Sequence, residues 1–275
     1  MSEPGVGVYL YCIVSPGSHP ELEGLIGVDG RSGVEAITSG ELTAITSRVS
    51  LEEFGSEPLK RNLEDLEWLE RTARAHDAVL AAMMAGDAVV PMRLLTIFTD
   101  ESRLLAMLDR ERDGIRRSLD RLRGHAEWSV KLLVDHRALE RAAHEQARQL
   151  AAARAPDSPG RAYFARKQGD RTARQKAREL AQAAATEAHA TLSAHAAASR
   201  RLRPQQSELS GRSGEMILNG AYLVDGAQSQ LFKDTAARLR ERHRGAGIDV
   251  ELSGPWAPYN FADEADRMAS AAGRS

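Results

Sequence analysis

A long Ala- and Arg-rich region limits the possible folds of this chain more than any other feature, because it interrupts a series of β-strands. The region follows an apolar strand at residues 127–134 and extends to Arg203, with one break that contains two prolines and a glycine at residues 155–160. Since proline and glycine are poor helix formers, this break divides the region into two helices. After them come, in order, a strand, an amphipathic helix and an alternating strand, at residues 217–225, 228–244 and 248–252.

The N-terminal half begins with β-structure and continues with helices. Residues 6–14 are apolar on nearly both faces, which predicts an interior strand, and two β-branched runs around Ser39-Gly40-Glu41 predict a hairpin. Leucine and other apolar residues spaced three and four positions apart, with His76 at one of these positions, predict a helix from Ser56 to near Gly86. A strand and a capped helix complete this half, at residues 94–98 and 100–124.

These segments predict an α+β fold with two domains, residues 1–125 and 126–275. A chain of 275 residues is long enough for two modest cores. The order of elements in the second domain resembles a ferredoxin-like split β-α-β arrangement whose helical crossover is long and interrupted, although the pattern shows one strand fewer than that fold requires.

Composition excludes several classes of protein. Lys and Arg number 37 against 39 Asp and Glu, so the net charge of -2 gives no general attraction to nucleic acid or to an anionic membrane. The single cysteine, Cys12, can form neither an internal disulfide nor a cysteine-based zinc site. The sequence lacks a membrane-spanning apolar stretch, and its N-terminus lacks the features of a signal peptide. We therefore expect a location in the cytoplasm.

Motifs that carry catalytic chemistry are missing from the sequence. The glycines and serines do not have the spacing of a phosphate loop, a dinucleotide turn or a nucleophile elbow, and the histidines do not pair at i, i+4 on a helix. We therefore predict no catalytic residue, no cofactor and no metal. An enzyme with a split site around His76, Arg93 and Glu127 remains an alternative.

Two clusters of charge have a simple interpretation. Glu64, Asp65, Glu67 and Glu70 are spread around a leucine-rich helix, which favours a solvated face. Residues 161–203 contain ten basic and three acidic residues, and this local excess could contact an acidic partner. The candidate residues for such a contact are Arg166, Arg174 and Arg178.

The last informative segment, GPWAPYNF at residues 254–261, contains Trp256, Tyr259 and Phe261. Its two prolines prevent regular strand pairing, so we predict an extended segment that follows the last strand. It either pins the C-terminus onto its own domain or presents a docking edge to an apolar partner. In the second case the three aromatic residues are the partner-binding candidates.

Five blocks in order resemble the gas vesicle accessory proteins of the GvpL/GvpF family. They are VYLYCIV (8–14), VVPMR (89–93), EWSVK (127–131), NGAYLV (219–224) and GPWAPYNF (254–261). Ala257 stands where the family pattern leads us to expect proline, so this segment is slightly less stiff.

The resemblance implies two α+β domains, the second ferredoxin-like, and a non-enzymatic role in building gas vesicles within the cytoplasm. It also implies binding to the small hydrophobic shell protein, which limits aggregation of that protein during vesicle nucleation, and incorporation as a minor component. A scaffold or regulatory protein with another client is the remaining alternative. Neither the type, L or F, nor the oligomeric state follows from the sequence.

Overall fold

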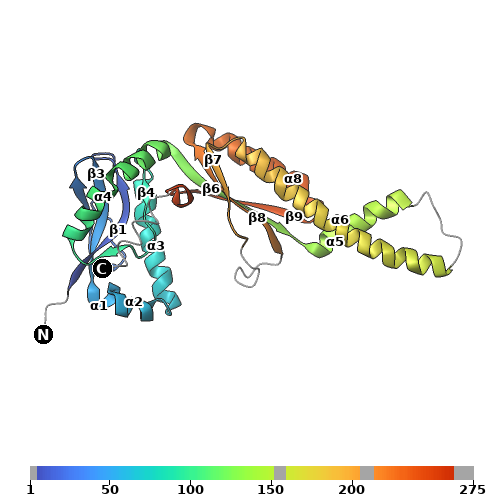
Figure 1. The fold of residues 1–275 in the computed structure, drawn as a ribbon, viewed down its shortest axis with the longest axis horizontal. Helices are drawn as coiled ribbons and strands as arrows, with labels where there is room; N and C mark the ends of the chain where they lie inside the picture. Colours follow the sequence, from blue (N-terminus) through green and yellow to red (C-terminus); the bar gives the residue numbers. More distant parts are fainter. Residues whose placement is uncertain (1–4, 152–158, 205–213, 263–275) are drawn as a thin grey trace. The chain divides into compact units, whose positions relative to one another are not determined.

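The chain folds into two compact units, which are described separately below (Figure 1). A computed structural model describes residues 5–151, 159–204 and 214–262, with only the backbone of residues 143, 146–151 and 159–173. The first unit combines the residues up to Glu127 with those from Pro255 onward, and the second is Trp128–Gly254. The division into domains 1–125 and 126–275 stays a prediction, and these units differ from it by assigning residues 255–262 to the first unit.

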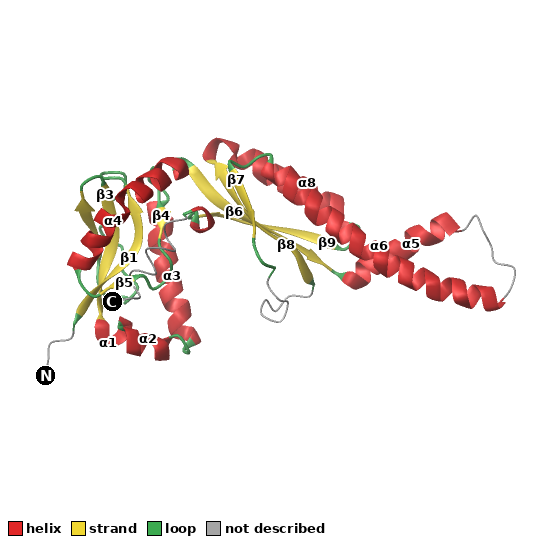
Figure 2. Cartoon of the chain, viewed as in Figure 1, coloured by secondary structure: helices red, strands yellow, loops and turns green. Residues whose placement is uncertain are grey.

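The first unit contains a five-stranded sheet, with helices packed beside it (Figure 2). The strands are β1 (Val6–Val14), β2 (Val34–Ser39), β3 (Leu42–Ser50), β4 (Val90–Pro91) and β5 (Ile97–Phe98). The helices are α1 (Leu51–Phe54), α2 (Ser56–Asn62), α3 (Leu66–Met83), α4 (Glu101–Leu122) and the short 3-10 helix η2 (Tyr259–Phe261).

Strand β1 lies inside the first sheet, as its apolar faces predict. The strand order is β2-β3-β1-β4, and β5 also pairs with β1. The register shifts between Leu10 and Cys12, which leaves Tyr11 as the extra residue of a β-bulge. Tyr9 and Tyr11 pack in one cluster with residues of α3, and α4 contacts β1 from the opposite face.

The predicted helix from Ser56 to Gly86 is wrong in its extent, because two shorter helices, α2 and α3, replace it. The leucine stripe crosses a break at residues 63–65, where Asp65 adopts an extended conformation and caps α3. Its carboxylate accepts hydrogen bonds from the backbone N–H groups of Glu67 and Trp68. An aspartate in this position starts a new helix, so the apolar periodicity continued while the helix did not.

The second unit has a four-stranded sheet in the order β7-β8-β6-β9. Its strands are β6 (His125–Val134), β7 (Ala198–Arg201), β8 (Glu215–Asp225) and β9 (Ile248–Trp256). Its helices are α5 (His136–Ala151), α6 (Pro159–Ser193), η1 (Gly226–Gln228) and α8 (Ser229–Arg244). Strand β7, with the sequence ASRR, has no apolar alternation, and it was therefore missed in the sequence.

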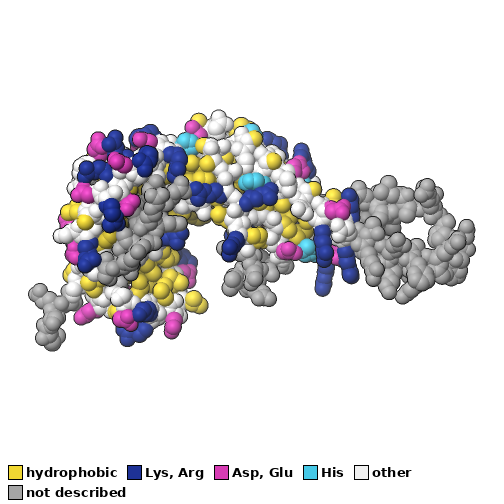
Figure 3. Space-filling model, in the orientation of Figure 1, with side chains coloured by type: hydrophobic (Ala, Val, Ile, Leu, Met, Phe, Trp, Pro, Cys, Tyr) yellow, Lys and Arg dark blue, Asp and Glu magenta, His cyan; other side chains and the backbone are white. Residues whose placement is uncertain are grey.

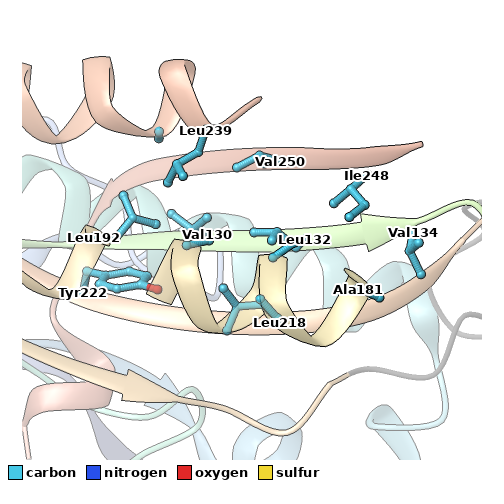
Figure 4. Packing of buried hydrophobic residues seen from close by; sticks show 14 of the residues in the cluster. Val130, Leu132, Val134, Ala181, Leu192, Leu218, Tyr222, Leu239, Ile248 and Val250 are labelled. Carbon is cyan, nitrogen blue, oxygen red and sulfur yellow. The ribbon is translucent and has the colours of Figure 1, made fainter. Parts of the chain in front are cut away.

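The core of the second unit lies between the sheet and helices α6 and α8 (Figure 4). Leu132 of β6, Leu218 of β8 and Ile248 of β9 belong to one buried cluster with Leu192 of α6 and Leu239 of α8. The buried face of α6 is otherwise made mostly of alanine, at residues 177, 181, 184, 185 and 188. Alanine side chains are short, so they allow a helix to pack closely on a sheet.

Candidate functional site

The aromatic segment at the end of the chain packs in the first unit. We call residues 255–262 the C-terminal strap. Its first two residues, Pro255 and Trp256, are the last two of β9, so the strand continues past the first proline, contrary to the sequence expectation. Gly254, just before the strap, has a φ of 128°, in a region that favours glycine. Within the strap the backbone closes on itself, because Tyr259 N–H donates to the Ala257 carbonyl at 2.8 Å and Phe261 N–H donates to the Pro258 carbonyl at 3.0 Å.

Tyr259 connects the strap to the interior of the first unit through His76. The Tyr259 hydroxyl lies 3.0 Å from His76 Nε2, and His76 Nδ1 lies 3.0 Å from the Tyr9 hydroxyl. The backbone N–H of Leu95, a residue with a φ of 65°, donates to the same Tyr9 hydroxyl at 2.9 Å. A hydrogen-bonded series of four residues therefore joins the strap to α3, to β1 and to the loop before β5.

Burial keeps the ionisable groups of this series uncharged at neutral pH. Loss of solvent lowers the pKa of His76 to about 4, although a backbone hydrogen bond with Met92 opposes the change. Burial also raises the pKa of Tyr9 and of Tyr259 above the ordinary tyrosine value. A neutral imidazole has one donor and one acceptor nitrogen, so it can bond to both hydroxyls at once.

A second set of contacts holds the strap on α4 and β6. The Glu127 carboxylate accepts from the backbone N–H of Asn260 at 2.8 Å and from its side-chain amide at 2.6 Å. Glu127 is only 5% exposed, so these charge-assisted bonds form away from water. Arg121 Nη2 donates to the Phe261 carbonyl at 2.5 Å. Both interactions lie within the first unit.

The three aromatic candidates have different environments. Phe261 is buried, and Tyr259 is half-buried with its hydroxyl bonded to His76. Trp256 has 49% of its surface exposed, so of the three it offers the most area to a partner. The segment pins the end of the chain, as one interpretation of the sequence held, but onto the first unit and not onto its own predicted domain. Partner binding by the three residues stays a prediction.

The arginine candidates lie on α6. Arg174 and Arg178 are exposed, and Arg174 Nε lies 3.8 Å from a carboxylate oxygen of Glu140 on α5. The side chain of Arg166 lies outside the described residues. Because the buried face of α6 is alanine, Arg174 and Arg178 extend into solvent, where an acidic partner can reach them.

The residues proposed for a split active site have structural contacts. His76 bonds to two tyrosines, and Glu127 bonds to Asn260. A pocket in the first unit is lined by other residues, namely Ser15, Pro16, Gly40, Glu41, Arg116, Leu119 and Asp120. Among the residues that the structure describes, no group of three or more His, Cys, Asp or Glu side chains could hold a metal ion.

Comparison with models of known protein families shows to which family this chain belongs. The model of the family described as "Gas vesicle synthesis protein GvpL/GvpF" matches residues 7–263, which include the second unit, most of the first unit and the whole strap. The chain belongs to this family. The resemblance noted from five sequence blocks is thereby confirmed. Within the described residues, no helix combines the length and the hydropathy that a membrane span requires.

Relatives named as gas vesicle proteins match nearly the whole GvpL/GvpF chain. Gas vesicle protein L of Streptomyces sp. (strain CB03234) is 38% identical over 94% of this chain and 93% of its own length. Gas vesicle protein F of the same strain is 27% identical over 94% and 100%, respectively. Gas vesicle protein L1 of Halobacterium salinarum is 25% identical over 94% of this chain and 91% of its own length.

Two crystal structures show the same fold. GvpF from Anabaena sp. PCC7120 has a TM-score of 0.67 at 18% identity and covers 94% of this chain and 96% of its own. GvpF from Microcystis aeruginosa has a TM-score of 0.63 at 17% identity, with 93% and 98% covered. The predicted α+β class, with helices and antiparallel strands in one chain, is confirmed.

Sequence reasoning missed the residues that receive the strap: His76, Glu127 and Arg121. One signal was present, because His76 interrupts an otherwise apolar stripe. A histidine in such a stripe is buried, and a buried histidine needs hydrogen-bond partners. The sequence contains no comparable signal for Glu127 or Arg121, since each is an ordinary charged residue at the end of a predicted element.

Proposed function

We propose that this protein is a non-enzymatic accessory and minor structural protein of gas vesicle assembly. On this proposal it binds the small hydrophobic shell protein, limits its aggregation during vesicle nucleation, and is located at the gas vesicle within the cytoplasm. The observation that carries the proposal is the family match over residues 7–263, which leaves no separate domain unaccounted for within that range.

The physical basis of this role is the covering of apolar surface. A small subunit that builds a gas-holding wall exposes apolar area before assembly, and exposed patches of several hundred Å² favour aggregation. A protein that covers these patches temporarily prevents the subunits from aggregating. The binding has to be of moderate affinity, because a subunit held too tightly would not reach the wall.

We further propose that the chain is of the L type. The support is a comparison within one organism, since identity to the L protein of Streptomyces sp. (strain CB03234) is 38% and identity to its F protein is 27%. We also propose that the second unit is ferredoxin-like. Strand β7 supplies the strand that the sequence pattern lacked, and the order β7-β8-β6-β9 is that of a split β-α-β sheet.

We assign the contact with the shell protein to the exposed Trp256 and to the arginines of α6, Arg166, Arg174 and Arg178. Tyr259 and Phe261 contribute by holding the strap in position. An indole that is half exposed is a suitable anchor for an apolar partner, and the exposed Arg174 and Arg178 can steer a partner that carries acidic residues.

The proposal is tested by light scattering from the purified shell subunit. We expect this protein to suppress scattering at substoichiometric to equimolar ratios. Trp256→Ala should melt at the normal temperature and lose most of the suppression, because the indole is at the surface. Leu231→Ala is the matched control, since Leu231 is an exposed apolar residue of α8. Unchanged scattering with the wild-type protein contradicts the proposed function, and a lower melting temperature for Trp256→Ala contradicts a binding role for the indole.

A further inference from the structure

Helix α2 of the first unit has no buried residue. A short helix on a protein surface normally buries one apolar side, because its stability comes mainly from packing and not from intrinsic propensity. Here the seven residues of α2 lead directly into α3 through a break at residues 63–65. We call residues 58–67 the α2–α3 corner. Of its apolar side chains, Leu59 packs against the core of its own unit, whereas Leu63 and Leu66 are exposed.

The α2–α3 corner presents leucine to solvent. Leu66 is 76% exposed and Leu63 is 45% exposed, the first of these being the highest value among the large exposed hydrophobic residues of the described chain. Pro58 and Leu59 are half-buried beside them in sequence, and Leu59 is one helical turn before Leu63. Figure 3 shows hydrophobic side chains at the surface of the first unit in the region of α2 and α3.

Acidic side chains accompany these leucines, and two of them take part in no ion pair within the described residues. Glu64 and Glu67 are exposed and form no ion pair within the described residues. Their neighbours differ, because Glu57 lies 2.5 Å from Lys60 and Glu70 lies 2.5 Å from Arg74. The carboxylate of Asp65 is occupied by capping α3. Glu64, Asp65 and Glu67 outnumber Lys60 and Arg61 by one, so the corner combines exposed leucine with a small excess of negative charge.

We propose that the α2–α3 corner docks an amphipathic segment of a partner protein, with apolar side chains on one face and Lys or Arg beside them. The leucines provide apolar area, and Glu64 and Glu67 select the charge that accompanies the apolar face of the partner. Phosphate-bearing partners do not fit, because the carboxylates repel nucleic acid and anionic lipid. This inference deepens the proposed function and rests on it, since it names a second surface with which the protein covers an apolar partner.

Two synthetic helical peptides of 18 residues test the charge selection. Both carry the same leucine face, and one has lysine while the other has glutamate at the remaining positions. Fluorescence anisotropy with the full chain should show that the lysine peptide binds at least about tenfold more tightly than the glutamate peptide, and that the preference weakens at high salt. Equal affinities, or binding of neither peptide, overturn the proposal.

Two double variants locate the binding site. Leu63→Ser with Leu66→Ser should weaken the lysine peptide by about tenfold or more, because both leucines lose their apolar surface. Glu64→Lys with Glu67→Lys should reverse the preference in favour of the glutamate peptide. Leu231→Ser, at an exposed leucine of the second unit, should bind as the wild type does. All four leucine and glutamate positions are exposed, so the melting temperatures should stay unchanged. Wild-type affinity in both double variants contradicts the assignment.

The shell-protein assay separates this inference from the proposed function. If the wild-type protein suppresses scattering and the Leu63→Ser, Leu66→Ser variant does not, the corner is part of the shell-protein surface. If both suppress scattering equally, the proposed function stands and the inference fails. If neither suppresses scattering, the proposed function fails, and the peptide titrations then decide whether the corner binds cationic amphipathic segments.

Discussion

The interior of the first unit contains a series of hydrogen-bonded aromatic side chains, whereas the second unit has the Tyr222–His189 pair and a long helix that is lined mostly by alanine. Tyr9 and Tyr11 of β1 are fully buried, and their hydroxyls bond to His76 and Ser47, respectively. In the second unit Ala181 and Ala188 of α6 face the sheet. A buried hydroxyl needs a partner in a particular position, while an alanine needs only a smooth surface. The core of the first unit therefore specifies where the strap docks, and the core of the second unit specifies how closely α6 approaches the sheet.

The largest expected effect is the removal of the Tyr9 side chain. Tyr9→Ala should lower the free energy of unfolding of the first unit by about 3–5 kcal/mol, because it leaves a cavity and leaves His76 and Leu95 without their partner. Hydrogen exchange, resolved by unit, measures the loss. Tyr9→Phe is the control, because it retains the ring and should cost only about 1–3 kcal/mol. Equal protection of both units in Tyr9→Ala contradicts the special role of this series.

Acid should weaken the first unit more than the second. The unfolded chain binds a proton at His76 below its ordinary pKa of 6.5, but the folded chain does so only near pH 4. The free energy of unfolding therefore decreases as the pH falls from 6.5 to 4, by up to about 3 kcal/mol. Burial also lowers the pKa of His189 in the second unit, but this histidine is half-exposed. We therefore expect acid to cost the second unit less than the first.

Urea unfolding at several pH values checks this difference. The His76→Gln variant should be less stable at neutral pH and should show a flatter dependence between pH 6.5 and pH 4, because glutamine does not titrate. If the wild type and the variant have parallel pH profiles, His76 is not the group responsible.

Enlarging an alanine should affect the second unit but not the first. Ala188 is fully buried between α6 and the sheet, so Ala188→Leu should cost about 1–3 kcal/mol through overpacking. Ala190→Leu is the matched control on the same helix, because Ala190 is exposed and should change stability by less than about 0.5 kcal/mol. Thermal unfolding of both variants provides the test, and similar losses for the two would show that α6 does not pack as described.

The smallest effect concerns the strap itself. Tyr259→Phe removes the hydroxyl that bonds to His76, and it should reduce the stability of the first unit by about 1 kcal/mol. Limited proteolysis of residues 255–262 should become faster. Tyr222→Phe in the second unit is the control, because its hydroxyl also bonds to a histidine, His189, at 3.0 Å. Faster cleavage of the strap in both variants would remove the link between Tyr259 and strap docking.

The elements that were predicted correctly have a local signal. Strand β1 was recognised by its apolar faces, α4 by its leucine stripe and its Asp100 cap, and β9 by its alternation. Strand β7 has no such signal, because two of its four residues are exposed arginines and its pairing with β8 alone makes it a strand. The break between α2 and α3 was also not predicted, because the hydrophobic spacing continues across it.

The candidate site was predictable only in part, because its contacts join distant residues. The clustering of aromatic residues indicated a strap, but not the surface that receives it. His76 and Tyr259 are 183 positions apart, and Glu127 and Asn260 are 133 positions apart. Local patterns of polarity contain no information about such pairs. The aromatic positions were therefore recognised, while His76 and Glu127 were considered only for a split active site and not as the partners of Tyr259 and Asn260.

The return of the chain to its first unit has a consequence for synthesis on the ribosome. Trp128–Gly254 form a continuous stretch, so the second unit can close as soon as that stretch has left the exit tunnel. The first unit is translated earlier but must wait for Tyr259 and Asn260 before the hydrogen bonds of His76 and Glu127 are complete. The part of the protein that is made first is therefore the last to be finished.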